Sequence, residues 1–277
     1  MSVSMRAFDV LRVRSGSSAT DRDRVAVELP LEVRLNSEPF SVIMRTPGDD
    51  RHLTLGFLLS ESVIRGIDDV ERVDLDEVEN VVNVWIDPHR VGDVLGQRRQ
   101  VTMNSSCGMC GRRSLESLSI EAKPFAIDWH VSESVVLGLP AELRRVQSTF
   151  AETGGLHAAG LFNLDGALKA SAEDVGRHNA VDKLLGRMLS ARRLPCDCSM
   201  LFVSGRSSFE IVQKAWLGGI RMIAAVSAPS SLAIDLAREA GMTLLGFVRD
   251  GRFNIYSGAD RLTVHAPSPK PQAPGQA

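Results

Sequence analysis

Hydrophobic and polar positions alternate along the first third of the chain. Apolar side chains occupy every second position over 25–35, which is typical of a half-buried strand, and 40–44 predicts a second strand after a tight turn. The turn sequence Thr46-Pro-Gly-Asp-Asp50 precedes a short helix expected near 53–60, and 81–86 predicts another strand. This part of the chain is therefore predicted to be α+β.

From about residue 152, predicted strands alternate with predicted helices. The strands are expected at 158–164, 168–170, 200–203, 222–226, 244–248 and 253–256, and the helices at 179–189, 207–217 and 231–240. Asp165-Gly166, between the first two strands, is a good hairpin turn. Such alternation implies a largely parallel or mixed sheet covered by helices, and so an α/β fold.

Composition suggests where these parts begin and end. Residues 1–20 are rich in Ser and Arg, and 266–277 is rich in Pro and polar residues, so both segments are predicted to be disordered. We expect an α+β N-terminal domain over 21–150, carrying a mobile loop at 104–114. A second, α/β domain with a mixed sheet is expected over 151–265.

Charge and hydropathy exclude several partners. Of the 277 residues, 44% are hydrophobic and 24% charged, and the net charge is −2. The balance gives no general attraction to nucleic acid or to an anionic membrane, so any phosphate recognition must be local. No apolar run approaches the roughly 20 residues that span a bilayer, and the N-terminus lacks an apolar signal core. A cytoplasmic protein is expected.

Two strand-to-helix junctions have nearly the same Ser-rich composition. They are Ser204-Gly-Arg-Ser-Ser208 and Ser227-Ala-Pro-Ser-Ser231. At the carboxyl edge of a sheet, hydroxyls and the N–H groups of a helix start can bind an anion, but serine also caps helices without any ligand. Ser207 and Glu210 have the spacing of a capping box, which would start a helix at this junction. Two junctions on one edge, with Arg206 beside one, favour a phosphate or pyrophosphate ligand.

A second concentration of ionisable groups lies over 173–183. If this segment is helical, Asp174, His178 and Asp182 form a polar stripe, for which a solvated helix face is the simplest interpretation. Two of the six histidines occur in short glycine-containing segments, which favours a functional role. These two are His178 and His157. A histidine beside alanines, as His157 is, more often belongs to the core.

Cysteine spacing leaves three kinds of chemistry open. Cys107-Gly-Met-Cys110 precedes two arginines that would stabilise a thiolate or a persulfide, so the pair can bind metal, exchange a disulfide or carry sulfur. A four-thiolate zinc site would need Cys196 and Cys198, whose spacing is too short for a normal zinc knuckle. Deaminase chemistry is excluded because the motif after His157 lacks the glutamate that shuttles protons.

Eight stretches, in order, resemble the formate dehydrogenase accessory sulfurtransferases, the FdhD/NarQ family. They cover most of the chain between about 25 and 256. They are MRTPGDD (44–50), GFLLSESVI (56–64), SSCGMCG (105–111), TGGLHAAGLF (153–162), EDVGRHNAVDKLLG (173–186), SGRSSFEIVQKA (204–215), SAPSSLAIDLA (227–237) and GFVRDGRFNIY (246–256).

The resemblance implies a sulfurtransferase with a cysteine persulfide intermediate. Such proteins take sulfur from a cysteine desulfurase and pass it to the molybdenum cofactor, in its bis(molybdopterin guanine dinucleotide) form, before it enters the catalytic subunit of formate dehydrogenase. By position, Cys107 would carry the sulfur and Cys110 would assist. The second domain of the family is related in fold to the cytidine deaminases. No tightly bound metal is expected, and we expect a homodimer.

The residues expected to bind the cofactor fall into two groups. The stretch that matches the cofactor-binding stretch of the family is Phe247, Val248, Arg249, Asp250, Gly251 and Arg252. The junction residues added to it are Ser204, Gly205, Arg206, Ser207 and Ser230, with Arg177 and His178. Two alternatives stay open: a chaperone that binds and delivers the cofactor with purely structural cysteines, and a zinc-stabilised interaction module.

Overall fold

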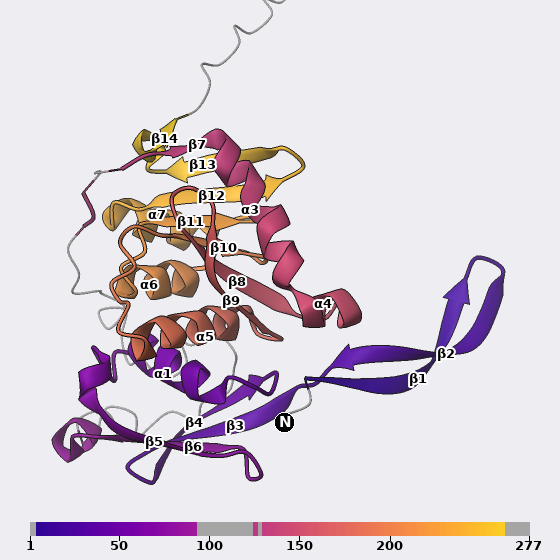
Figure 1. The fold of residues 1–277 in the computed structure, drawn as a ribbon, viewed down its shortest axis with the longest axis horizontal. Coiled ribbons are helices and arrows are strands. Elements are labelled where there is room, and N and C mark those ends of the chain that lie inside the picture. Colours follow the sequence, from indigo (N-terminus) through magenta and orange to yellow (C-terminus); the bar gives the residue numbers. More distant parts are fainter. Residues whose placement is uncertain (1–3, 93–123, 127–128, 264–277) are drawn as a thin grey trace, which may run out of the picture.

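The protein is built on two mixed sheets. The computed structural model describes residues 4–92, 124–126 and 129–263 (Figure 1). The smaller sheet has the strand order β4-β3-β6-β5, and the larger has the order β13-β12-β11-β10-β8-β9. Each sheet contains parallel and antiparallel pairs. The predicted α/β fold class with a mixed sheet is confirmed.

Alternating side chains build the four-stranded sheet. Its elements are β3 (Leu29–Leu35), β4 (Glu38–Arg45), α1 (Asp50–Ser60), a 3₁₀ turn (Ile67–Asp69), β5 (Val70–Asp76) and β6 (Val81–Ile86). Leu31, Val33 and Leu35 point to one face and pack with apolar residues of α1. Among the described residues, no helix covers the opposite face (Figure 1). One helix on one face is what an alternating strand pattern requires.

The six-stranded sheet is covered on both faces. Its strands are β8 (His157–Phe162), β9 (Leu168–Asp174), β10 (Met200–Val203), β11 (Met222–Ala225), β12 (Thr243–Arg249) and β13 (Arg252–Ser257). The helices α5 (Arg177–Ser190), α6 (Phe209–Leu217) and α7 (Ser231–Glu239) cover one face, and α3 (Glu133–Val146) covers the other (Figure 1).

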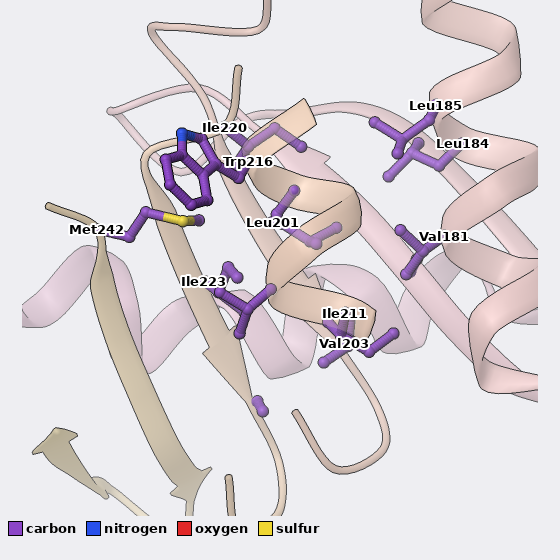
Figure 2. Close-up of a cluster of buried hydrophobic side chains, with 14 of the residues drawn as sticks. Val181, Leu184, Leu185, Leu201, Val203, Ile211, Trp216, Ile220, Ile223 and Met242 are labelled. Atoms are coloured by element: carbon purple, nitrogen blue, oxygen red, sulfur yellow. The ribbon is translucent and has the colours of Figure 1, made fainter. Parts of the chain in front are cut away.

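Strand β10 shows why its sequence is apolar throughout. Leu201 and Val203 join the core under α5, α6 and α7, where they lie close to Ile211 and Val181 (Figure 2). The intervening residues of the strand face the α3 side. A strand buried on both faces therefore reads as a continuous apolar run rather than an alternation.

Two helices join the sheets. Helix α1 crosses α5 so closely that a Cβ on Gly56 would overlap the backbone carbonyl of Asp182, and one on Gly186 would overlap that of His52. Glycine at both positions permits a backbone-to-backbone contact that any larger residue would prevent. The two parts of the molecule are consequently packed as one unit.

The N-terminal segment differs from its prediction. Residues 1–20 were expected to be disordered, but β1 (Met5–Arg14) and β2 (Ser17–Ala26) form a ten-pair antiparallel hairpin. Ladder hydrogen bonds and cross-strand ion pairs, such as Arg12 with Asp21, hold a ribbon that composition alone does not reveal. The single strand expected over 25–35 is also wrong, because β2 ends at Ala26 and β3 begins at Leu29.

The expected boundary at 150–151 falls inside a helix. Helix α4 (Ser148–Thr153) spans this position, and α3, placed by prediction in the first domain, packs on the six-stranded sheet. Strand β7 (Val131–Ser132) pairs with β14 (Leu262–Thr263), which follows the 3₁₀ turn Ala259–Arg261. The boundary was misplaced because strand–helix alternation starts only after two helices already belong to the second sheet.

The predictions of a mobile loop and of a disordered tail stay predictions. The loop at 104–114 and the segment 266–277 lie outside the described residues. Across the ranges that the structure describes, no helix combines the length and apolar character needed to cross a bilayer.

Candidate functional site

Three helices begin at one edge of the six-stranded sheet. Strands β10, β11 and β12 are parallel, and β9 runs in their direction because β8 is antiparallel to both β9 and β10. The carboxyl ends of these strands therefore lie at the same edge, where α5, α6 and α7 begin. Free N–H groups and the helix dipole make each start attractive to an anion.

The two Ser-rich junctions lie side by side at this edge, as the sequence predicted. Ser207 and Pro229 form an isolated parallel bridge, and the backbone N–H of Ser230 donates to the carbonyl of Ser207 at 3.0 Å. Arg206 is exposed on the same junction. The two junctions, which are at least 22 positions apart in the sequence, therefore form one surface.

A bulge in β12 brings the third predicted segment to the same place. The backbone N–H of Phe247 donates to the carbonyl of Ser227 at 3.2 Å, and the register of β12 against β13 shifts after Gly246. Phe247 has a φ of 55°, which is rare for an aromatic residue and is found mainly where surrounding contacts impose it. The bulge thus places the backbone of Phe247 against the junction of Ser227.

The rest of the 247–252 stretch divides between core and turn. Val248 is fully buried among the apolar residues under α3, so its side chain cannot contact a ligand at the edge. Asp250 and Gly251 both have positive φ and form the turn into β13. Arg249 and Arg252 are exposed, and the Arg249 guanidinium lies 5.8 Å from the centre of the Phe247 ring. The arginines and Phe247 remain available to a ligand.

The capping box predicted at the first junction is not formed. Helix α6 starts one residue later than expected, with Ser208 as its N-cap and with no side-chain cap hydrogen bond. Ser208 Oγ donates instead to Glu210 Oε2 at 2.6 Å and lies 3.1 Å from His178 Nε2. At the second junction Ser230 does cap its helix, accepting from the N–H of Ala233 at 3.3 Å.

Two buried polar atoms at this edge have no hydrogen-bond partner in the described part of the chain. They are Ser207 Oγ, in a residue that is fully buried, and Arg177 Nε, at the first residue of α5. Native proteins seldom leave buried polar atoms unpaired, and such an atom commonly marks a missing ligand or water. Both atoms therefore point to an anionic or hydrogen-bonding ligand at the helix starts.

His157 belongs to this site, although the sequence favoured a core histidine. It begins β8, and a Cβ on Gly205 would come within 3.4 Å of its Nδ1 and 3.5 Å of Arg177 Cδ. Burial lowers the pKa of His157, and the charges of Arg177 and His178 lower it further. These effects favour the neutral form of the ring. Its neighbouring Gly154-Gly155 was the only signal in the sequence.

Glu210 is the second residue that the sequence did not assign to the site. Burial raises the pKa of its carboxyl, but hydrogen bonds from His178 and Ser208 outweigh burial and bring the pKa to about 2. The carboxylate is thus ionised and balances part of the positive charge around Arg177. His178 lies in the wall of the site, 3.5 Å from Glu210, rather than on a solvated face.

The expected polar stripe of 174, 178 and 182 is buried. Asp174 ends β9 instead of lying in the helix, and its carboxylate lies 2.7 Å from Lys183 Nζ. Asp182 binds Lys214 Nζ at 2.7 Å and accepts from the Ser60 hydroxyl at 2.8 Å. The solvated-face interpretation is wrong because each carboxylate has a buried cationic partner, which is what makes burial of a charge tolerable.

The cysteines separate into two groups. Cys107 and Cys110 lie outside the described residues. Cys196 is buried, and burial raises the pKa of its thiol to about 11, so it is a poor thiolate nucleophile at neutral pH. Cys198 is exposed, and within the described ranges no group of three His, Cys, Asp or Glu side chains could hold a metal ion.

This edge defines an α/β protein with a candidate anion site at the carboxyl ends of its parallel strands, where three helices begin. The chain belongs to the FdhD/NarQ family, whose profile matches residues 26–263.

Individual relatives agree along almost their whole length. The chain is 47% identical over 269 residues to the sulfur carrier protein FdhD of Streptomyces coelicolor, covering 93% of this chain and 95% of that protein. It is 46% identical to the sulfur carrier protein FdhD of Saccharolobus solfataricus, covering 95% of this chain and 100% of the relative. A crystal structure of a candidate formate dehydrogenase accessory protein from Desulfotalea psychrophila matches with a TM-score of 0.77 and 26% identity, covering 94% and 100% of the two chains.

Proposed function

We propose that this protein is a sulfurtransferase that serves formate dehydrogenase maturation. It takes persulfide sulfur from a cysteine desulfurase and delivers it to bis(molybdopterin guanine dinucleotide) molybdenum cofactor, which is its substrate. Membership of the FdhD/NarQ family and relatives named as sulfur carriers support the sulfur-carrying role. The catalytic subunit of formate dehydrogenase is the proposed destination of the cofactor.

The observation that carries the cofactor assignment is the pair of unpartnered atoms at the helix starts. Arg177 Nε and Ser207 Oγ are buried, and both lie where α5 and α6 present free N–H groups. A dinucleotide cofactor carries pyrophosphate groups, whose oxygens accept hydrogen bonds from such donors. Phe247 and the exposed Arg249 supply an apolar face and a charge beside the phosphates.

The sulfur step needs an accessible thiolate. In the proposed reaction the Cys107 thiolate attacks the outer sulfur of the donor persulfide, the donor S–S bond breaks, and the donor cysteine leaves as a thiolate. Cys107 then holds a persulfide whose terminal sulfur is the atom to be transferred. Cys110 assists or shares this load. Cys196 is unsuited to the role because its thiol stays protonated.

Mass spectrometry tests the carrier. After incubation with a cysteine desulfurase and cysteine, Cys107 is expected to gain about 32 Da, the mass of one sulfur atom. Mapping on the Cys107→Ala and Cys110→Ala single variants, with and without GDP, assigns the sulfur to one thiol or both. Full restoration of formate dehydrogenase activity by the double variant, in cells lacking the native protein, would refute the sulfurtransferase.

A cofactor-delivery chaperone with structural cysteines is the second candidate. The observation in its favour is that the two unpaired atoms at the helix starts are Arg177 Nε and Ser207 Oγ, and that neither belongs to a cysteine. In that case the double variant would lose stability and keep GDP binding, and no persulfide would form. Persulfide formation together with loss of maturation in the double variant decides for the sulfurtransferase.

A further inference from the structure

We propose that Glu210 is a positioning residue of the anion site: it keeps the Ser208 hydroxyl from capping α6 and so leaves the start of that helix uncapped for a phosphate group. This role rests on the proposed function, in which the site binds the pyrophosphates of a dinucleotide cofactor. Ser208 is the N-cap of α6, and Glu210 is the second residue of the helix. Glu210 therefore acts on the ligand through another side chain.

Helices α6 and α7 begin with nearly the same backbone. The N-cap Ser208 has a φ of −88° and a ψ of 173°, and the N-cap Ser230 has a φ of −84° and a ψ of 162°. A serine in this conformation normally accepts a hydrogen bond from an N–H of the first helical turn. Ser230 does so, since its Oγ accepts from the N–H of Ala233 at 3.3 Å. Ser208 makes no such bond, and its backbone conformation does not explain why.

The second residue of each helix accounts for the difference. It is Glu210 in α6 and Leu232 in α7. Because the pKa of Glu210 is about 2, its carboxylate is ionised and can only accept. Ser208 Oγ gives its single proton to Glu210 Oε2 at 2.6 Å, so its contact of 3.1 Å with His178 Nε2 is one in which the ring N–H donates. The serine hydroxyl is thereby held between two partners.

An uncapped helix start suits an anion. The first N–H groups of a helix have no partner within the helix, and a capping side chain satisfies one of them. In α6 the N–H of Ile211 corresponds to the one that Ser230 caps in α7, and Ser208 leaves it uncapped. Helix α5 also begins without a side-chain cap, because its N-cap is Gly176. Of the three helices that begin at this edge, two are therefore uncapped within the described ranges.

These two uncapped starts adjoin the buried atoms that lack partners in the described part of the chain. Arg177 Nε belongs to the first residue of α5, and Ser207 Oγ belongs to the residue before the N-cap of α6. The starts are also adjacent, since a Cβ on Gly205 would lie 3.5 Å from Arg177 Cδ and His178 contacts Ser208. A phosphate group of the ligand is therefore placed between α5 and α6.

Isothermal titration calorimetry with GDP tests the role of Glu210 in a double-mutant cycle. Glu210→Ala releases the Ser208 hydroxyl to cap α6 and is expected to weaken GDP binding about fivefold. Removing a carboxylate near an anion would by charge alone strengthen binding, so a loss of affinity points to the cap. In a Ser208→Ala background, where no hydroxyl can cap the helix, Glu210→Ala should not weaken binding.

Three further variants separate positioning from a general loss of stability. Glu210→Gln keeps an oxygen that accepts from Ser208 and should retain the affinity for GDP, although the charge and its contribution to stability are lost. Glu210→Leu copies the second residue of α7, repeats the test with a larger side chain if the alanine variant does not fold, and should also bind GDP about fivefold more weakly. Leu232→Ala is the matched control at the same position of α7 and should bind GDP like the wild type.

The outcomes distinguish this role from the proposed function. A wild type that does not bind GDP would refute the cofactor site and the role of Glu210 together. If the wild type binds GDP and Glu210→Ala weakens binding equally in both backgrounds, or in neither, only the role of Glu210 is refuted. The same conclusion follows if Glu210→Gln binds GDP as weakly as Glu210→Ala.

Discussion

At the scale of single residues, the sheet edge holds two buried polar atoms that have no hydrogen-bond partner among the described residues. A buried donor or acceptor without a partner costs roughly 1–3 kcal/mol, and Arg177 Nε and Ser207 Oγ are two such atoms at one place. A ligand that pairs both would recover part of that free energy. Ligand binding should therefore raise the Tm as well as occupy the site.

Removing the guanidinium should weaken phosphate binding directly. Arg177→Ala is expected to lower the affinity for GDP, a probe for one half of the proposed substrate, by about tenfold, because a charge-assisted hydrogen bond is lost. Isothermal titration calorimetry measures the effect. Arg34→Ala, on β3 of the four-stranded sheet, serves as the control and should bind GDP normally. Equal affinities for both variants would disprove phosphate recognition by Arg177.

The depressed pKa of Glu210 predicts a pH-dependent stability. Because its pKa falls from 4.5 to about 2 on folding, its contribution is fully present above about pH 4.5 and is lost as the pH falls toward 2. Glu210→Gln should cost about 3 kcal/mol of unfolding free energy at pH 6 and progressively less toward pH 3. Urea titrations of both proteins at each pH test this. A difference that does not change with pH would contradict the assignment.

Side-chain roles at the edge were only partly predictable from the sequence. The serine junctions were recognised because Ser-rich helix starts are a local signal. The partners of those serines were not, since a one-residue shift of the α6 start turned an expected cap into the unpaired Ser207. His157 reaches the site through the pairing of β8 with β10, which no local pattern encodes.

The sequence predicted the elements that have a clear local pattern of apolar residues. It did not predict the elements that are held in place by contacts with other parts of the chain. The strands expected at 81–86 and 200–203 coincide with β6 and β10, because short apolar runs bounded by polar turns are typical of strands. Helix α3 was missed, since Gly138 and Pro140 lower its helix propensity and packing on the sheet holds it in place. The β1–β2 hairpin depends on cross-strand pairs rather than on composition.

The crossing of α1 and α5 should tolerate no added carbon. Gly56→Ala would place a methyl group against the backbone of α5 and is expected to lower the unfolding free energy by about 3 kcal/mol. Chemical denaturation followed by circular dichroism measures the change.

Helix α3 supplies the matched control for that crossing. Gly138 lies inside the helix and faces open space, so Gly138→Ala should be neutral or stabilising by up to about 1 kcal/mol. Equal effects of the two substitutions would mean that the close crossing contributes nothing.

At the scale of the whole molecule, one carboxylate links the two sheets. Asp174 Oδ2 accepts from the backbone N–H of Thr46 at 3.2 Å and lies 2.7 Å from Lys183 Nζ, which also donates to the Thr46 carbonyl at 2.9 Å. The turn after β4 is thereby fixed to the start of α5, next to Arg177. The buried ion pair of Arg45 with Asp50, at 2.9 Å, stiffens the same turn.

Neutralising this carboxylate should destabilise both sheets together. Asp174→Asn leaves Lys183 buried without its counter-charge and is expected to cost about 3 kcal/mol. In a Trp85→Phe background, tryptophan fluorescence reports only Trp129 and Trp216 of the second sheet, whereas far-UV circular dichroism reports the whole chain. The two signals should give one midpoint. Separate midpoints would show that the sheets unfold independently.

Helix α5 places a limit on how this protein can be engineered. Val181, Leu184 and Leu185 lie in the core of the large sheet, while Leu189 of the same helix lies in the core of the small one. A fragment cut between the sheets would leave one end of α5 without its neighbours, with apolar surface open to aggregation. Transplanting the sheet edge where α5, α6 and α7 begin into another scaffold therefore means carrying α1 and its strands along with it.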